Sequence, residues 1–245
     1  MRQWGPARLT AAGFLLLILA GAALLMMPFA QASTTHTTPL TALFTATSAV
    51  SLTGLVVEDT ATFWSPAGQV IILALIQLGG LGIMSLASLS GLVLTGRISF
   101  KARKTSAYEG RPITAGGIRR TLLFTFAFTA TVETTIAAVV AVRLVAGYDY
   151  SLPHAVWVGV FHAISAFNNA GFSTYSDNLV PFVTDAWILL PLAAALIGGG
   201  LGFPVWAELI RPTTTVRRVS ITARMTLAAT GILLIAGMVL VACAE

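Results

Sequence analysis

Two short segments, 117 residues apart, carry the residues of this sequence that are best suited to bind a ligand. Residues 44–54 read FTATSAVSLTG and residues 161–171 read FHAISAFNNAG, and the two align without gaps. The identical pairs are Phe44/Phe161, Ala46/Ala163, Ser48/Ser165, Ala49/Ala166 and Gly54/Gly171. A glycine can turn the neighbouring carbonyl oxygens toward a common axis at no steric cost. Because rings of carbonyl oxygens can replace the hydration shell of a monovalent cation, the pattern indicates ion coordination rather than catalysis.

The candidates for ion coordination are the last four residues of each segment, Ser51, Leu52, Thr53, Gly54, Asn168, Asn169, Ala170 and Gly171. In this interpretation the backbone carbonyl oxygens face the ion. Two alternatives remain for the asparagine side chains. Their amide oxygens could coordinate the ion directly, or, as we favour, their amide groups could brace the backbone through hydrogen bonds.

Glu133 is a further candidate, because it is a carboxylate in the middle of an apolar segment. An ionisable group inside a membrane is costly and is by default a functional candidate that faces a partner or a cavity. The structural alternative is that Glu133 satisfies backbone or hydroxyl groups of a neighbouring helix, for example Thr or Ser of a short helix. Both interpretations stay open at the level of the sequence.

The composition identifies the elements that must position these residues as membrane helices. The 245 residues are 56% hydrophobic and 9% charged, with a mean hydropathy of +0.87, whereas soluble domains are about 25% charged. A helix needs roughly 20 apolar residues to cross the hydrocarbon core. The apolar runs predict five crossings, at about residues 9–30, 69–95, 121–146, 187–210 and 225–243.

The charges predict the orientation of these crossings. Apart from Arg143, the 14 basic residues lie at 2–8, 97–120 and 211–224, between alternate apolar runs. This asymmetry is typical of cytoplasmic loops, so we expect a multi-pass protein of the cell membrane with a cytoplasmic N-terminus. The same placement argues against nucleic acid as a partner. Asp59 and Asp177 lie in the segments expected outside, where they could attract cations or serve only as solvated acids.

The cysteine and histidine content predicts no transition-metal site. The chain has one cysteine, Cys243, which excludes an intramolecular disulfide, and His154 and His162 have no third ligand near them.

The first apolar span has an alternative interpretation as a signal peptide. A basic start, an apolar run and the sequence Ala-Gln-Ala at 30–32 fit a secretory signal and its cleavage site. We favour a retained membrane helix, because the duplication requires this span as the partner of residues 121–146.

The duplication extends to the flanking spans. The run GGLGI at 79–83 matches GGLGF at 199–203, at an offset of 120 residues. These glycines lack the Lys-Ser/Thr of a phosphate-binding loop, so we interpret them as small residues that let helices approach closely. The segments at about 38–50 and 153–167 are too short to cross and suit re-entrant helices. The predicted organisation is a first repeat at 1–96, a cytoplasmic basic loop at 97–120, a second repeat at 121–210, and a loop with the first helix of a third repeat at 211–245.

The motifs SAVSLTGLVV, LIQLGGLGIM, FHAISAFNNAGFS and IGGGLGFP resemble the Trk/Ktr/HKT superfamily of cation transporters, and the N-terminal half of the bacterial Ktr/Trk membrane subunit most closely. The resemblance implies an all-α membrane fold of helix, pore helix, filter and helix, repeated four times around one pore. It places the filter at residues 51–54 and 168–171. Two repeats and the first helix of a third are matched, so the missing C-terminal repeats are expected as partners.

The resemblance also implies the ion and the other partners. A serine in place of the first filter glycine goes with Na⁺ preference in plant members, so Gly54 and Gly171 favour K⁺. Family members form dimers on a cytoplasmic ring of nucleotide-binding regulatory subunits, and residues 97–120 are expected to take part in that contact. The alternative is that these charges set the topology and contact anionic lipid.

The expected function is therefore K⁺ translocation through backbone carbonyls, with no enzyme activity and no cofactor besides the transported K⁺ or Na⁺. Two alternatives are kept: a Na⁺- or H⁺-coupled symporter, and a non-conducting fragment that needs the missing half.

Overall fold

The computed structural model describes residues 6–32, 37–97, 115–210 and 221–244. Across these ranges the regular secondary structure is helical, and β-structure is limited to an isolated bridge between Gln31 and Trp64. The predicted all-helical class is confirmed.

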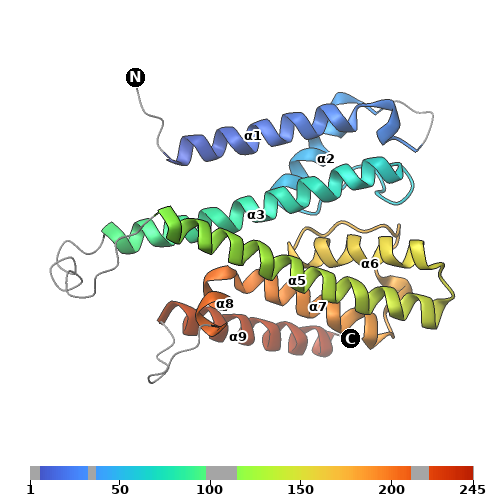
Figure 1. Cartoon of the computed structure of the whole chain (residues 1–245). Coiled ribbons are helices and arrows are strands. Elements are labelled where there is room, and N and C mark those ends of the chain that lie inside the picture. The colour runs from blue at the N-terminus through green and yellow to red at the C-terminus, as the bar shows by residue number, and fades with distance from the viewer. Residues whose placement is uncertain (1–5, 33–36, 98–114, 211–220, 245) are drawn as a thin grey trace.

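The first half of the chain forms a unit of two long helices and a short one. Helix α1 (Pro6–Leu25) and helix α3 (Pro66–Arg97) both pack against α2 (Pro39–Ser51), as Figure 1 shows. A short 3₁₀ helix, Pro28–Ala30, follows α1. The buried core between the helices is made of small and aliphatic side chains, among them Ala42, Ala46, Val50 and Ile76. Small residues on α2 let the two long helices come close to it.

The second half repeats this arrangement with α5 (Ala115–Tyr148), α6 (Leu152–Phe167) and α7 (Ala186–Leu201). Helix α6 packs against both α5 and α7, and a 3₁₀ helix, Val180–Phe182, precedes α7. Its core contains Val140, Leu144, Val158 and Ile188. The two units therefore share the order of their α-helices, while the 3₁₀ helix follows the first helix in one unit and the short helix in the other.

The short helices begin where the sequence supplies a proline and a polar residue. In α2, Pro39 occupies the first turn and the hydroxyl of Thr38 accepts from the backbone N–H of Thr41 at 3.1 Å; a proline also lies in the first turn of α6. Helices α2 and α6 have 13 and 16 residues. At 1.5 Å per residue they extend about 20 and 24 Å, less than the roughly 30 Å of a hydrocarbon core.

The structure divides one of the predicted spans into two helices. The span predicted at 187–210 is not one helix, because α7 ends at Leu201 and a separate helix, α8 (Phe203–Ile210), follows. Gly202 between them has φ 77°, and Pro204 has no backbone N–H to donate, so both interrupt the helix. Helix α5 begins at Ala115, inside the range 97–120, and the assignment of that range as a cytoplasmic loop stays a prediction. Residues 98–114 and 211–220 lie outside the described residues.

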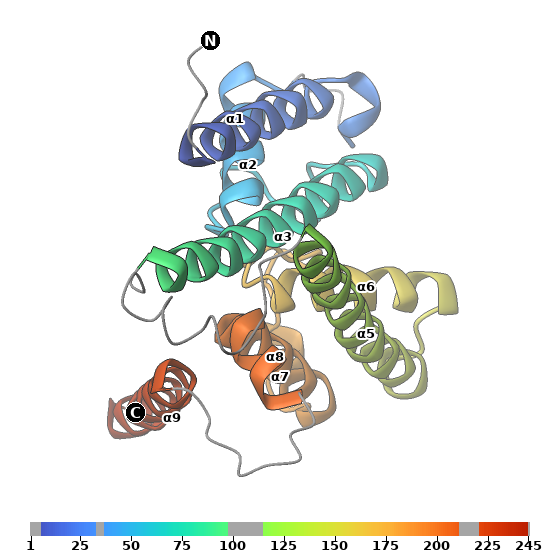
Figure 2. The same cartoon turned by 60° about the vertical axis from the view of Figure 1, so that its left-hand side comes forward.

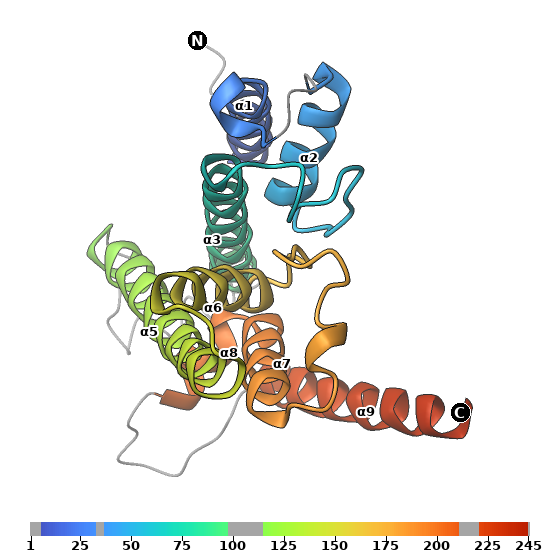
Figure 3. The same cartoon turned by 90° about the vertical axis from the view of Figure 1, so that its right-hand side faces the viewer.

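Within the described residues, two helical segments are long and apolar enough to cross a membrane, Leu123–Tyr148 and Ile221–Cys243. Shorter apolar stretches lie in α1, α3, α6 and α7. Length and composition alone are a weak criterion, so the topology of five crossings stays a prediction. The second of these segments belongs to α9 (Ile221–Ala244), which projects away from the other helices and exposes most of its apolar side chains (Figure 3).

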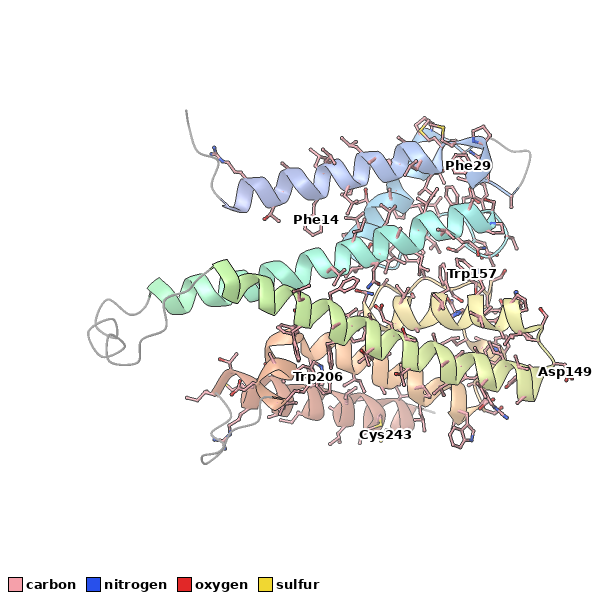
Figure 4. All side chains as sticks on the ribbon, in the orientation of Figure 1. Phe14, Phe29, Asp149, Trp157, Trp206 and Cys243 are labelled. Atoms are coloured by element: carbon pink, nitrogen blue, oxygen red, sulfur yellow. The ribbon has the colours of Figure 1, made fainter. Side chains whose placement is uncertain are left out.

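The two units meet where α3 lies against α6. Figure 2 shows α3 between α1 and α2 on one side and the second unit on the other. Trp157 of α6 points into this junction (Figure 4), and its indole N–H donates to the side-chain oxygen of Gln69 at 3.1 Å. On the loops, the hydroxyl of Ser176 donates to the carboxylate of Asp59. We call residues 51–54 and 168–171, which follow α2 and α6, the return segments, and these contacts join the two units that carry them.

A charged contact fixes the start of α7 against α5. The carboxylate of Asp185 accepts from Arg143 Nε at 2.7 Å, from the Tyr148 hydroxyl at 3.0 Å, and from the backbone N–H of Trp187 at 2.9 Å. Burial opposes ionisation of Asp185, but these hydrogen bonds outweigh it and hold the pKa of the carboxyl below its ordinary value. Arg143, the basic residue outside the three predicted clusters, thus has a structural partner.

Candidate functional site

The two return segments adopt the same backbone conformation. After α2, Leu52 and Gly54 have φ of 58° and 72°; after α6, the matched Asn169 and Gly171 have φ of 57° and 74°. Residues with a Cβ atom rarely adopt a positive φ, whereas glycine adopts it freely. The duplication seen in the sequence is therefore also present in the backbone dihedral angles. Ser51 is the last residue of α2, so the first segment turns one residue beyond it.

Matched hydrogen bonds hold both segments under the ends of their helices. The backbone N–H of Thr53 donates to the carbonyl of Ser48 at 3.0 Å, and that of Ala170 donates to the carbonyl of Ser165 at 2.8 Å. Both serines are buried. Their hydroxyls differ in partner: Ser48 Oγ accepts from the Thr53 hydroxyl at 3.0 Å, whereas Ser165 Oγ donates to the carbonyl of Phe172 at 2.7 Å.

The two glycines bring the return segments into contact. A Cβ atom placed on Gly54 would lie 2.7 Å from the carbonyl oxygen of Ala170 and 3.2 Å from the Cα of Gly171. A Cβ on Gly171 would lie 3.2 Å from the Cα of Gly54. The structure thus brings Gly54, Ala170 and Gly171 together, while Ser51, Thr53 and Asn169 stay exposed.

The glycines of α3 and α7 make room for the ends of the short helices. A Cβ on Gly79 would lie 2.2 Å from the carbonyl oxygen of Val50, and a Cβ on Gly199 would lie 1.7 Å from that of Phe167. Val50 and Phe167 are themselves matched by the 117-residue offset. Gly79 and Gly199 thus act as small residues that allow close approach, whereas Gly202 of the same motif ends α7.

The asparagine side chains contact protein groups. Asn169 Nδ2 donates to the carbonyl oxygens of Leu196 at 3.2 Å and Phe167 at 3.4 Å. Asn168 is 3% exposed, and its Nδ2 donates to Ile164 O at 2.9 Å and to Glu133 Oε1 at 3.1 Å. Both side chains thus make hydrogen bonds to protein groups, and whether they brace an ion site stays a prediction.

Glu133 accepts from side-chain amides, whereas the structural alternative stated from the sequence was backbone or hydroxyl groups of a neighbouring helix. Besides the bond from Asn168, its Oε2 accepts from Gln77 Nε2 at 3.1 Å, and Gln77 Oε1 accepts from Asn168 Nδ2 at 3.1 Å. Gln77 was not singled out in the sequence, although a polar side chain inside an apolar span was the available signal. Whether Glu133 acts in function stays a prediction.

A buried histidine holds the chain beyond the second glycine. One ring nitrogen of His162, Nδ1, lies 2.9 Å from the carbonyl of Val158, and Nε2 lies 3.1 Å from Ser173 Oγ. Its role is thus to tie the exit of the return segment to α6. The sequence offered no signal for it, since the matched residue in the first copy is Thr45.

Asp59 on the loop between α2 and α3 forms hydrogen bonds with neighbouring groups. Its carboxylate accepts from the backbone N–H of Ala61 at 3.0 Å, from the Thr62 hydroxyl at 2.9 Å, and from Ser176. Burial opposes its ionisation, but these bonds outweigh that cost and lower the pKa of Asp59. The carboxylate therefore keeps its charge while it links the loop between α2 and α3 to the loop between α6 and α7.

Sequence similarity to known proteins gives evidence that is independent of this geometry. Residues 9–233 match the family described as "TrkH: Cation transport protein". The chain is 34% identical to the "Potassium/sodium uptake protein NtpJ" of Enterococcus hirae, covering 98% of the chain and 52% of that protein. It is 39% identical to the "Ktr system potassium uptake protein B" of Bacillus subtilis, covering 85% of the chain and 46% of that protein.

A protein named "Ktr system potassium uptake protein B" from Vibrio alginolyticus is 34% identical, over 84% of the chain. The chain spans about half the length of the curated relatives it matches. This family match extends over α1 to α9 and includes both return segments. The chain therefore belongs to the TrkH family of cation transport proteins.

Proposed function

We propose that this chain forms part of a K⁺ pathway across the cell membrane, in which backbone carbonyls of residues 51–54 and 168–171 hold the ion. The observation that carries the proposal is the pair of positive-φ glycines, Gly54 and Gly171, brought together from two matched units. Carbonyl groups on such return segments suit a monovalent cation, which they bind in place of water. The family is one of cation transport proteins rather than of enzymes.

The proposed fold is two tandem repeats, each of a membrane helix, a pore helix, a filter segment and a second membrane helix. Matched φ values, matched hydrogen bonds and matched glycine contacts support it. Non-helical backbone at membrane depth is tolerated where it lines a watery cavity or packs on protein. The lengths of α2 and α6 support their assignment as pore helices.

A complete pathway needs further repeats, and one face of α2 supports this. Leu40, Leu43, Phe44 and Thr47 are exposed on α2, with Phe44 at 38%, whereas the matched Phe161 of α6 is 0% exposed. The matched face of α6 packs on the core of the first unit. By the same repetition, the exposed face of α2 is where the second membrane helix of a further repeat would pack. Helix α9 is proposed as the first helix of a third repeat.

We propose K⁺ as the principal ion because both matched filter positions are glycine. The relatives are named for potassium or for potassium and sodium uptake. Two of them are named as parts of a Ktr system, which supports a cytoplasmic nucleotide-binding regulatory ring as partner of a homodimer. Residues 97–120 are the proposed contact, with anionic lipid as the competing partner, and the N-terminus is proposed to be cytoplasmic.

The test uses what we call the complete transporter, meaning this chain together with the half of its relatives that it does not cover. Purified in liposomes, it is expected to take up Rb⁺, with K⁺ competing more strongly than Na⁺. The chain without that half is expected to carry no Rb⁺ and to gain uptake when the second half is co-expressed. Rb⁺ uptake no greater than in empty liposomes would overturn the proposal.

The coupling of transport is read from reversal potentials of the same liposomes. A passive, channel-like pathway predicts a potential that follows the K⁺ gradient and ignores gradients of Na⁺ and pH. A shift with either gradient identifies the symporter instead.

A further inference from the structure

The side chains of Gln77, Glu133 and Asn168 form a closed ring of hydrogen bonds between the two units. Gln77 lies on α3, Glu133 on α5, and Asn168 directly after α6. Three contacts of 3.1 Å join them: Asn168 Nδ2 to Glu133 Oε1, Asn168 Nδ2 to Gln77 Oε1, and Gln77 Nε2 to Glu133 Oε2. Asn168 and Glu133 are 3% and 8% exposed. A buried polar ring of this kind is costly unless every contact pairs a donor with an acceptor.

The hydrogen-bond donors and acceptors of the ring limit which side chains fit at positions 77 and 133. The two N–H groups of the Asn168 amide face three acceptors, Gln77 Oε1, Glu133 Oε1 and the carbonyl of Ile164, so the two side chains share these N–H groups with the carbonyl. With Gln77 Nε2 donating to Glu133 Oε2, residues 77 and 133 together present three acceptors and one donor. One carboxylate and one amide meet this requirement. Two amides leave a donor facing a donor, and two carboxylates leave an acceptor facing an acceptor as well as a second buried charge.

The ring is specific to the second return segment. In the first copy the residue matched to Asn168 is Ser51, whose hydroxyl donates to the carbonyl of Thr47 at 2.6 Å. This copies the contact from Asn168 to Ile164, four residues earlier in its helix, but it reaches no other unit. The residue matched to Glu133 is Leu16, which is exposed. The duplication therefore does not explain the ring.

Helix α3 is also shaped to receive Asn168. A Cβ on Gly80 would lie 1.8 Å from Asn168 Oδ1, so the asparagine fits only because position 80 has no side chain. Asn168 in turn precedes Asn169, the positive-φ residue of the second return segment. The first unit thus supplies Gln77 and Gly80 to a contact that fixes the entry of the second unit's return segment.

We propose that Gln77 and Glu133 are positioning residues for the second return segment, holding Asn168 so that the carbonyls of residues 168–171 keep their orientation toward the ion. The proposal rests on the proposed function. It assigns Glu133 a role through Asn168 and not as a ligand of the ion. It also makes the ion selectivity of the second unit depend on a residue of the first.

The test exchanges the carboxylate and the amide. In the complete transporter, Glu133→Gln and Gln77→Glu are each expected to lower the K⁺/Na⁺ permeability ratio by about tenfold, the size expected of one mismatched buried contact. The double variant Gln77→Glu/Glu133→Gln again presents three acceptors and one donor, and is expected to return the ratio to within about twofold of the starting value. Asp149→Asn is the control, since it removes a carboxylate at φ 55°, where asparagine is well accommodated.

The K⁺/Na⁺ permeability ratio is measured on the folded fraction of each variant. The K⁺-dependent rise in melting temperature is a second readout that does not require transport. If both single variants keep the K⁺/Na⁺ ratio and lose only folded protein, the ring is merely structural and the proposal fails. If the double variant stays as unselective as Glu133→Gln, Glu133 acts at its own position and the proposal also fails. An unmutated transporter without K⁺ preference would instead refute the proposed function on which the inference rests.

Discussion

Replacing Gly54 by alanine is expected to abolish K⁺-selective transport by the complete transporter while leaving most of the protein folded. The added Cβ would lie 2.7 Å from the carbonyl oxygen of Ala170, and it would sit on a residue with φ 72°. The left-handed backbone costs a non-glycine residue about 1–2 kcal/mol, and the close contact adds to this. The least costly relief is to rotate the peptide groups of the two return segments, which moves the carbonyls proposed to hold the ion.

Gly171→Ala is expected to have the smaller effect of the two. Its φ of 74° carries the same strain, but the added Cβ would meet only the Cα of Gly54, at 3.2 Å. Gly13→Ala is the control, because nothing lies within 4 Å of a Cβ at that position of α1. The measurement is the K⁺/Na⁺ permeability ratio in liposomes. An unchanged ratio in Gly54→Ala would remove the return segments from the ion pathway.

Replacing Gly199 by alanine is expected to prevent stable folding of the second unit. The added Cβ would lie 1.7 Å from the carbonyl oxygen of Phe167, a backbone atom at the end of α6. Neither α6 nor α7 can yield without breaking its packing, so we expect a loss of about 2–3 kcal/mol or more. Gly79→Ala is expected to act likewise, with 2.2 Å to the carbonyl of Val50.

The neighbouring Gly198 supplies a matched control for this prediction. A Cβ there would lie 3.8 Å from the ring of Trp206, which is an ordinary contact, and alanine favours a helix over glycine by about 1 kcal/mol. Thermal unfolding of the detergent-purified protein, followed by size-exclusion chromatography, should show Gly198→Ala as stable as the original chain. Equal melting temperatures for Gly198→Ala and Gly199→Ala would contradict the close approach of α7 to α6.

The sequence predicted those features that depend on local pattern and on the duplication. The short helices, the positive-φ glycines and the glycine contacts occur at positions that match in the two aligned segments. A residue type repeated at the same position in both copies indicates the same local structure in both. The break between α7 and α8 was missed, although Gly202 and Pro204 supplied a local signal. The predicted span at 187–210 was based on the length of the apolar run, and these two residues were given too little weight.

The contacts that join distant parts of the chain could not be predicted from the sequence. Gln77 and Asn168 are 91 residues apart, and Arg143 and Asp185 are 42 apart. Such pairs depend on how helices rotate against each other, which the apolar periodicity of a membrane span does not fix when every face is apolar. The amide partners of Glu133 were therefore not among the backbone or hydroxyl groups considered from the sequence.

The central claim is that the carbonyls of the two return segments hold the transported ion. Its most direct test is anomalous X-ray diffraction from crystals of the complete transporter in which K⁺ is replaced by Rb⁺. We expect an anomalous peak beside the carbonyl oxygens of residues 51–54 and 168–171, and a weaker peak there in the Gly54→Ala variant. A peak confined to the surroundings of Glu133, or no peak beside either return segment, would contradict the claim.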